Sequence, residues 1–180
     1  MPDYAQEDGV DPERSTETFA EIVLEIESVR WASTRFLLRA GKALARRRKE
    51  AVVRFRSVRH QPFGYSSAEL AANVLQIGLD GPDDLALHLT GSVIGPPPHL
   101  TPLTLTAPPL SSELPAYAHV LLDILGGGSA LSVRGDKAKV DWGVVTPVLQ
   151  AWAAGLVPLL EYQAGSAGPP PLVDTSRRAG

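Results

Sequence analysis

The chain has 180 residues, 44% of them hydrophobic, a formal net charge of -3 and no cysteine. A chain of this length fits one ordinary domain with a core of its own. The lack of cysteine excludes disulfides and cysteine-ligated zinc. No stretch approaches the roughly 18 apolar residues of a membrane span. Because the acidic start is also unlike a secretory signal, we expect a cytoplasmic protein without membrane contact.

Charge is distributed unevenly along the chain. Eleven of the 17 basic residues lie within residues 30–59, where Glu50 is the only acid, and residues 1–29 hold nine of the 20 acids. A charge run is usually a solvated face, but it can also bind an anion. A phosphate dianion needs fixed donors: arginine can hold two oxygens at once, whereas lysine supplies a movable charge.

After a polar leader over residues 1–16, alternating apolar and polar positions predict strands. In the first of them Ile22, Leu24 and Ile26 share one face. Further strands are predicted at residues 36–39, 53–56, 74–79, 85–90 and 103–106. Short, turn-rich connections such as residues 80–83 favour antiparallel neighbours, because parallel pairing needs long crossovers.

The last third of the chain changes to helical spacing. Pro115 suits a first helical position, and residues 126–128, all glycine, end that helix. A second helix is predicted from Asp136 as N-cap, with a kink at Pro147. Strands followed by helices predict an α+β fold, a large mostly antiparallel β-sheet with two or more C-terminal helices packed on it. Residues 166–180 read as a loose tail.

One family resemblance covers nearly the whole chain. It is carried at the start by Thr16-Glu17-Thr18-Phe19, Arg30-Trp31, Phe36, Leu38-Arg39, Gly41-Lys42, Leu44 and Arg47, and later by Leu114-Pro115, Trp142, Tyr162 and Ala164-Gly165-Ser166. In residues and spacing this pattern resembles the C-terminal domain of glucose-6-phosphate dehydrogenase. The resemblance implies a domain over residues 17–165, between the leader and the tail. It also implies a mostly antiparallel sheet that forms the dimer interface.

The resemblance also implies two substrate-binding residues. The family's lysine against the sugar phosphate corresponds to Lys42, and a second basic residue that reaches the substrate corresponds to Arg47. One departure affects their setting. The family's Gly-Val-Pro-Phe turn reads Ser33-Thr34-Arg35-Phe36 here, without the glycine and the proline.

The family's coenzyme domain and catalytic histidine belong to an N-terminal half that these residues do not match. No glycine-rich turn lies between a strand and a helix to hold a dinucleotide. The histidines at 60, 88, 99 and 119 are scattered, without a paired carboxylate or ligand spacing. Some members hold a second, structural NADP, but Gly78 stands where the family carries one of its arginines. We therefore predict no catalytic residue and no metal, and NADP only through a partner's coenzyme domain.

The leading interpretation is a stand-alone C-terminal domain that is inactive without a partner. It would contribute substrate-side and oligomer-forming surface to NADP-dependent oxidation of glucose 6-phosphate in the pentose phosphate pathway. The expected partners are a dehydrogenase coenzyme-domain polypeptide or a second copy of the chain. The alternative is a non-catalytic module that senses a sugar phosphate or a dinucleotide. Nucleic-acid binding is disfavoured because the chain is acidic overall and its basic run lacks base-stacking groups; a decayed fragment without function is a further alternative.

Overall fold

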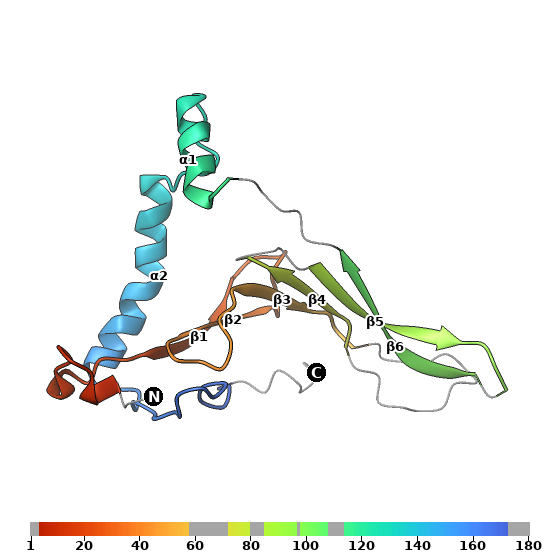
Figure 1. Cartoon of the computed structure of the whole chain (residues 1–180), viewed down its shortest axis with the longest axis horizontal. Helices are drawn as coiled ribbons and strands as arrows, with labels where there is room; N and C mark the ends of the chain where they lie inside the picture. Colours follow the sequence, from red (N-terminus) through yellow and green to blue (C-terminus); the bar gives the residue numbers. More distant parts are fainter. Residues whose placement is uncertain (1–3, 58–71, 80–84, 97, 108–113, 173–180) are drawn as a thin grey trace. The chain divides into compact units, whose positions relative to one another are not determined.

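The computed structural model describes residues 4–57, 72–79, 85–96, 98–107 and 114–172 (Figure 1). The chain divides into two compact units. The first unit comprises Met1–Arg46 and Leu114–Leu172, and the second comprises Arg47–Glu113 and Val173–Gly180. The predicted turn at residues 80–83, His60 and the end of the tail from residue 173 lie outside the described residues.

The first unit contains a β-hairpin that brings distant parts of the sequence motif together. Strand β1 (Phe19–Glu25) pairs antiparallel with β2 (Arg35–Gly41), so that Phe19 lies opposite Gly41 and Ile22 opposite Leu38. Residues 19–24 of β1 are half-buried. Two short 3₁₀ helices precede the hairpin, η1 (Tyr4–Gln6) and η2 (Pro12–Arg14), within the predicted leader.

Two helices of the first unit follow the predicted order. Helix α1 (Ala116–Leu125) begins directly after Pro115, and α2 spans Gly135–Ala153. The prediction of Asp136 as the N-cap of α2 is wrong: the N-cap is Arg134, and the Asp136 carboxylate accepts hydrogen bonds from the Arg134 guanidinium at 3.0 and 2.8 Å. Among the described residues, no helix is long and apolar enough to cross a membrane.

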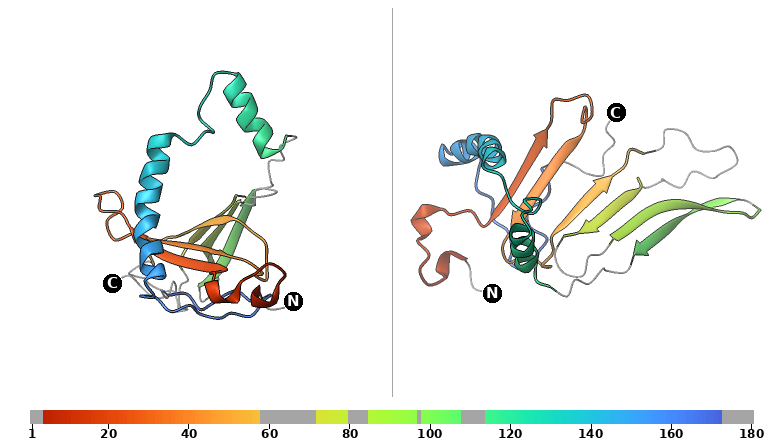
Figure 2. Two further views of the ribbon diagram at one scale, coloured as in Figure 1. Left: turned by 90° about the vertical axis from the view of Figure 1, so that its left-hand side faces the viewer. Right: turned by 90° about the horizontal axis from the view of Figure 1, so that it is seen from above.

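The second unit contains a four-stranded antiparallel sheet in the order β3-β4-β5-β6 (Figure 2). The strands are β3 (Glu50–Arg54), β4 (Val74–Gly78), β5 (Leu85–Val93) and β6 (His99–Ala107). Strands β5 and β6 form the longest pair, with Leu85 opposite Ala107 and Val93 opposite His99. The α+β prediction with antiparallel sheets and two helices is confirmed, and the described strands lie in two sheets rather than one.

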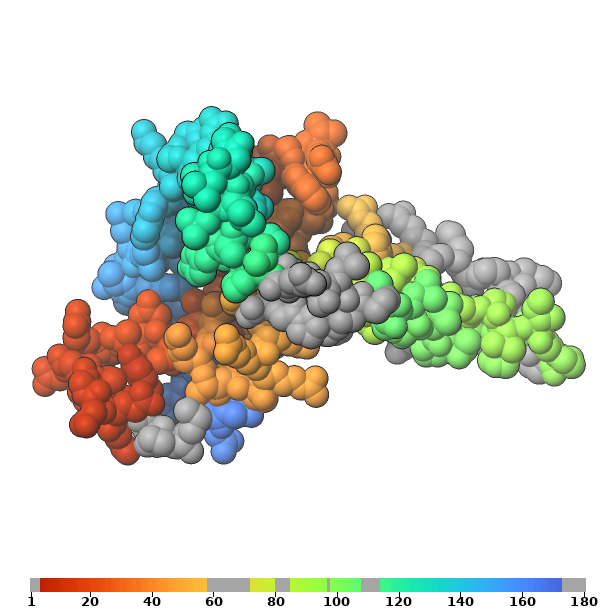
Figure 3. All heavy atoms as spheres, turned by 45° about the horizontal axis from the view of Figure 1, so that its top comes forward, coloured from red at the N-terminus to blue at the C-terminus, as the bar shows by residue number. Residues whose placement is uncertain are grey.

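Many large apolar side chains are exposed in both units. None of the described residues is fully buried. On α1, Tyr117 is 85% exposed and Leu125 is 82% exposed, and Trp142 on α2 is 63% exposed. Leu103 and Leu105 of β6 are also exposed. The atoms of β5 and β6 are drawn in green in the space-filling view (Figure 3).

Candidate functional site

Lys42 lies at the open end of the hairpin, where β2 ends and β1 begins. It follows β2 directly, and the pairing of Phe19 with Gly41 brings it beside the residues that precede β1. The Lys42 backbone N–H donates to the Thr18 carbonyl at 2.8 Å, one step beyond the last strand pair. The ladder therefore fixes the backbone of the lysine against the segment that carries Glu17.

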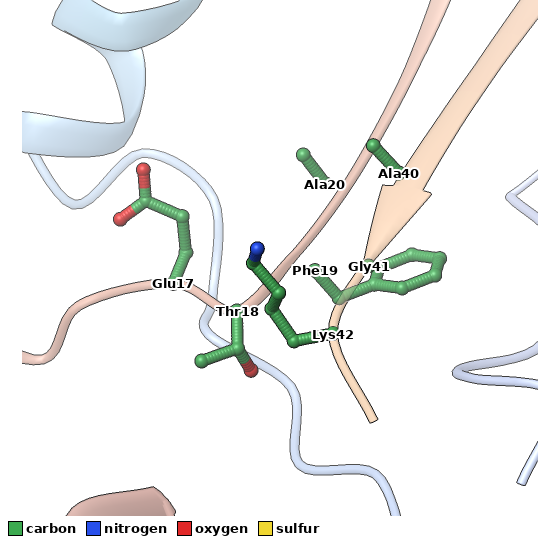
Figure 4. A pocket seen from close by; sticks show the side chains of 7 residues that line it. All are labelled: Glu17, Thr18, Phe19, Ala20, Ala40, Gly41 and Lys42. Carbon is green, nitrogen blue, oxygen red and sulfur yellow. The ribbon is translucent and has the colours of Figure 1, made fainter. Parts of the chain in front are cut away.

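An open pocket of about 300 Å³ forms at this end of the hairpin. It is lined by Glu17, Thr18, Phe19, Ala20, Ala40, Gly41 and Lys42. The side chains of Lys42 and Glu17 extend to the same side of the pocket, whereas Thr18 points to the opposite side (Figure 4). The small residues Ala20, Ala40 and Gly41 leave the space between them open.

The pocket combines one cation with one carboxylate on a small apolar floor. The Lys42 ammonium carries three donors that suit phosphate oxygens. The Glu17 carboxylate is an acceptor and suits hydroxyl groups rather than a phosphate. A ligand with a phosphate at one end and hydroxyls at the other matches this arrangement. At about 300 Å³ the pocket is at the small end of ligand sites.

Phe19, which lines the pocket, has close neighbours around its ring. An added Cβ at Gly41 would lie 2.6 Å from Phe19 Cδ2, and one at Gly168 would lie 2.8 Å from its Cε2. The Arg39 guanidinium carbon lies 5.1 Å from the ring centroid, and the Tyr162 ring lies 5.6 Å away. Residues separated by more than 140 positions in sequence thus meet at Phe19.

Arg39 forms an ion pair and a hydrogen bond within the first unit. Its Nε lies 2.7 Å from Glu21 Oε2, and its side chain also donates to the Pro169 carbonyl at 2.7 Å. The other Glu21 oxygen accepts the Leu172 backbone N–H. The Glu21 side chain is only 5% exposed. Arg39 therefore holds residues 169–172 against the hairpin, and its charge is already paired.

Arg47, the second predicted site residue, does not line the pocket that holds Lys42. It is exposed and belongs to the second unit. In the same basic run Arg48 pairs with Glu50 at 2.9 Å, and Glu50 also accepts from Gln76 at 2.9 Å. The role of Arg47 in substrate binding stays a prediction.

Two pocket residues, Glu17 and Thr18, received no role in the sequence analysis. They belong to the quoted motif, so the signal was their position directly before the first strand. Tyr162, which also carries the family resemblance without an assigned role, contacts Thr18 and Lys42 through its hydroxyl although it lies 120 residues beyond the lysine. No local pattern points to such a contact.

One described histidine makes a contact between neighbouring strands. The ring of His88 is hydrogen-bonded to the Thr104 hydroxyl across β5 and β6, with Nδ1 and Oγ1 separated by 3.1 Å. In the part of the chain that the structure describes, no three His, Asp or Glu side chains gather as a metal ion would require.

Similarity to known proteins covers the chain from end to end. The family "Glucose-6-phosphate dehydrogenase, C-terminal domain" matches residues 1–180. Glucose-6-phosphate 1-dehydrogenase of Treponema pallidum is 33% identical over 175 residues, which are 94% of this chain and 34% of the relative. Glucose-6-phosphate 1-dehydrogenase 2 of Mycobacterium tuberculosis is 32% identical over 179 residues, 97% of this chain and 35% of the relative.

Solved structures of dehydrogenases are similar in fold. A glucose-6-phosphate dehydrogenase in complex with glucose 6-phosphate superposes with a TM-score of 0.83 at 25% identity, over 93% of this chain and 35% of the other. Glucose-6-phosphate 1-dehydrogenase from Mycobacterium avium gives 0.75 at 26% identity, over 92% of this chain and 35% of the other. The chain thus spans about a third of the length of its relatives. It belongs to the glucose-6-phosphate dehydrogenase family, of which it represents the C-terminal domain.

Proposed function

We propose that this domain supplies the sugar-phosphate side of an NADP-dependent glucose-6-phosphate dehydrogenase whose coenzyme domain lies outside these 180 residues. Lys42 binds the phosphate of glucose 6-phosphate as a movable charge. The observation that carries the proposal is the pocket at the end of the hairpin, where Lys42 and Glu17 extend to one side.

Glu17 complements the lysine in this proposal. A carboxylate accepts hydrogen bonds from sugar hydroxyls, whereas it repels a phosphate dianion. The ligand would therefore bind with its phosphate toward Lys42 and its hydroxyls toward Glu17. Arg47 is proposed as a second substrate-binding residue on the family resemblance alone.

The exposed apolar side chains support a partner surface. Tyr117 and Leu125 on α1 and Trp142 on α2 present more apolar area than a solvated domain needs. We propose that a coenzyme-domain polypeptide or a second copy of the chain covers part of this surface. We propose that NADP binds that coenzyme domain, as the family resemblance implies.

Titration calorimetry with glucose 6-phosphate tests the site. We expect the wild-type chain to bind the ligand. We expect Lys42→Ala to raise Kd by at least about 10-fold, the usual contribution of a hydrogen bond to a charged group. Arg47→Ala raises Kd by a smaller factor. The exposed Lys139→Ala on α2 serves as a matched control and leaves Kd unchanged. Equal affinity of the wild type and both site variants removes the assignment of Lys42 and Arg47.

A sensing module without catalysis is the second candidate. It is favoured by one observation: all the residues that line the pocket come from one hairpin and from the residues directly next to its strands. Such a site needs no second domain to bind a sugar phosphate. This candidate is supported over the first if the chain binds glucose 6-phosphate and if its capture from a host extract brings down no dehydrogenase polypeptide.

A further inference from the structure

We propose that Tyr162 is a positioning residue that holds Lys42 in its ligand-binding place. The inference rests on the proposed function, in which Lys42 binds the sugar phosphate. The Tyr162 hydroxyl oxygen lies 2.8 Å from the Lys42 carbonyl oxygen, 3.1 Å from the Thr18 hydroxyl and 3.2 Å from the Thr18 carbonyl oxygen. One phenol thus contacts two of the residues that line the pocket, Thr18 and Lys42.

The inventory of donors gives these contacts a direction. A phenol has one proton, and the Lys42 carbonyl is its shortest acceptor. The Thr18 hydroxyl then donates to the Tyr162 oxygen. Because the Lys42 N–H already donates to the Thr18 carbonyl at 2.8 Å, the tyrosine closes a small network around the backbone of the lysine. The network fixes the base from which the lysine side chain extends.

The residue after Lys42 shows why such a support is needed. Ala43 has a φ of 49°, in the left-handed region that residues other than glycine rarely adopt. Its carbonyl accepts the Gly165 N–H at 2.7 Å, and the Ala45 N–H donates to the Ser166 carbonyl at 2.8 Å. The turn that carries Lys42 is therefore held by residues close to Tyr162 in sequence. Strained conformations of this kind persist only where the surroundings over-determine them.

The Tyr162 ring has its own packing, separate from the hydroxyl. It lies against Phe19, which is enclosed by Gly41 and Gly168. Tyr162→Phe therefore removes the hydroxyl and keeps the ring contact. This substitution isolates the hydrogen bonds to Lys42 and Thr18 from the packing of the hairpin.

Titration of the 180-residue chain with glucose 6-phosphate tests the inference in wild type, Tyr162→Phe, Lys42→Ala and the double variant. We expect Tyr162→Phe to raise Kd by roughly 3- to 10-fold, the usual worth of one hydrogen bond. The same substitution has no further effect when the Lys42 side chain is absent, because it acts through that side chain. Tyr117→Phe, on an exposed tyrosine of α1, is the control and leaves Kd unchanged.

A second readout does not depend on the ligand. Hydrogen exchange at the Lys42 and Ala45 amides becomes faster in Tyr162→Phe if the hydroxyl holds the turn. An unchanged Kd in Tyr162→Phe, in a chain whose binding depends on Lys42, overturns the inference and leaves the proposed function intact. An equal loss in the Lys42→Ala background also overturns it, since the tyrosine would then act through general structure.

Failure of the proposed function looks different. A wild-type chain that binds no glucose 6-phosphate, or binds it independently of Lys42, overturns the proposed function and the ligand-binding role of Tyr162 with it. Hydrogen exchange then tests only whether the Tyr162 hydroxyl stabilises the turn. Unchanged exchange rates at the Lys42 and Ala45 amides in Tyr162→Phe would contradict that stabilisation.

Discussion

The carboxylate of Glu21 and the guanidinium of Arg39 lie 2.7 Å apart on neighbouring strands, directly opposite each other in the register of β1 and β2. The acid is 5% exposed and the base 30% exposed. Each also holds the C-terminal segment, Arg39 through Pro169 and Glu21 through Leu172. This pair therefore joins the hairpin to residues that follow it by about 130 positions.

Glu21→Gln tests the pair. The amide keeps the shape of the side chain but leaves the Arg39 charge without its counterion in a half-buried place, so we expect a loss of about 1–3 kcal/mol in the free energy of unfolding. Urea titration followed by circular dichroism measures it. The exposed pair of Arg134 and Asp136 gives a control: Arg134→Gln changes the same free energy by less than about 0.5 kcal/mol. Equal effects of the two substitutions contradict the structural role of Glu21.

Substitution of Gly168 and of Gly155 by alanine distinguishes backbone strain from a steric clash with Phe19. Both have positive φ, 84° and 67°, but an added Cβ meets the Phe19 ring only at Gly168. Gly155→Ala lowers the free energy of unfolding by about 1 kcal/mol through the left-handed backbone alone. Gly168→Ala lowers it by about 1–3 kcal/mol more, since the enclosed ring cannot move aside. Thermal or urea denaturation of the two variants gives the difference, and a zero difference would show that Phe19 is not enclosed as described.

Ser33 has a strained backbone at a position where the sequence departs from the family pattern. It stands where the resemblance implies a glycine, and it has a φ of 61° in the connection between β1 and β2. A serine in this region is strained by about 1–2 kcal/mol, whereas glycine loses about 0.5–1 kcal/mol of backbone entropy. Ser33→Gly is therefore expected to raise the free energy of unfolding by about 0.5–1 kcal/mol. Ser28→Gly, nearby in the same connection, lacks this strain and gives no gain; a loss of stability in Ser33→Gly would contradict the account.

Local pattern was enough to predict most of the secondary structure. The alternation of Ile22 and Leu24 and of Leu103 and Leu105 placed two of the strands, because a half-buried sheet selects that period. The N-cap of α2 was missed because Asp136 is engaged by a neighbouring arginine, which no propensity describes. Helix and strand ends depend on such side-chain contacts.

The candidate site was only partly predictable. Lys42 came from the family resemblance, and its pocket partner Glu17 lay in the same motif without an assigned role. Tyr162 carries the family resemblance, but its contact with Thr18 could not be predicted from local pattern, because it spans 144 residues and depends on how the chain returns to the hairpin. The left-handed turn at Ala43 could not be predicted either, because alanine carries no signal for positive φ.

The first experiment is capture of the tagged chain from an extract of its own host. The bound polypeptides are quantified by mass spectrometry and assayed for glucose-6-phosphate-dependent reduction of NADP. The account predicts a coenzyme-domain polypeptide in fixed proportion and activity in the eluate. It also predicts that Lys42→Ala recovers the same polypeptide with activity reduced at least about 10-fold. Recovery of no dehydrogenase polypeptide, or full activity with Lys42→Ala, would contradict it.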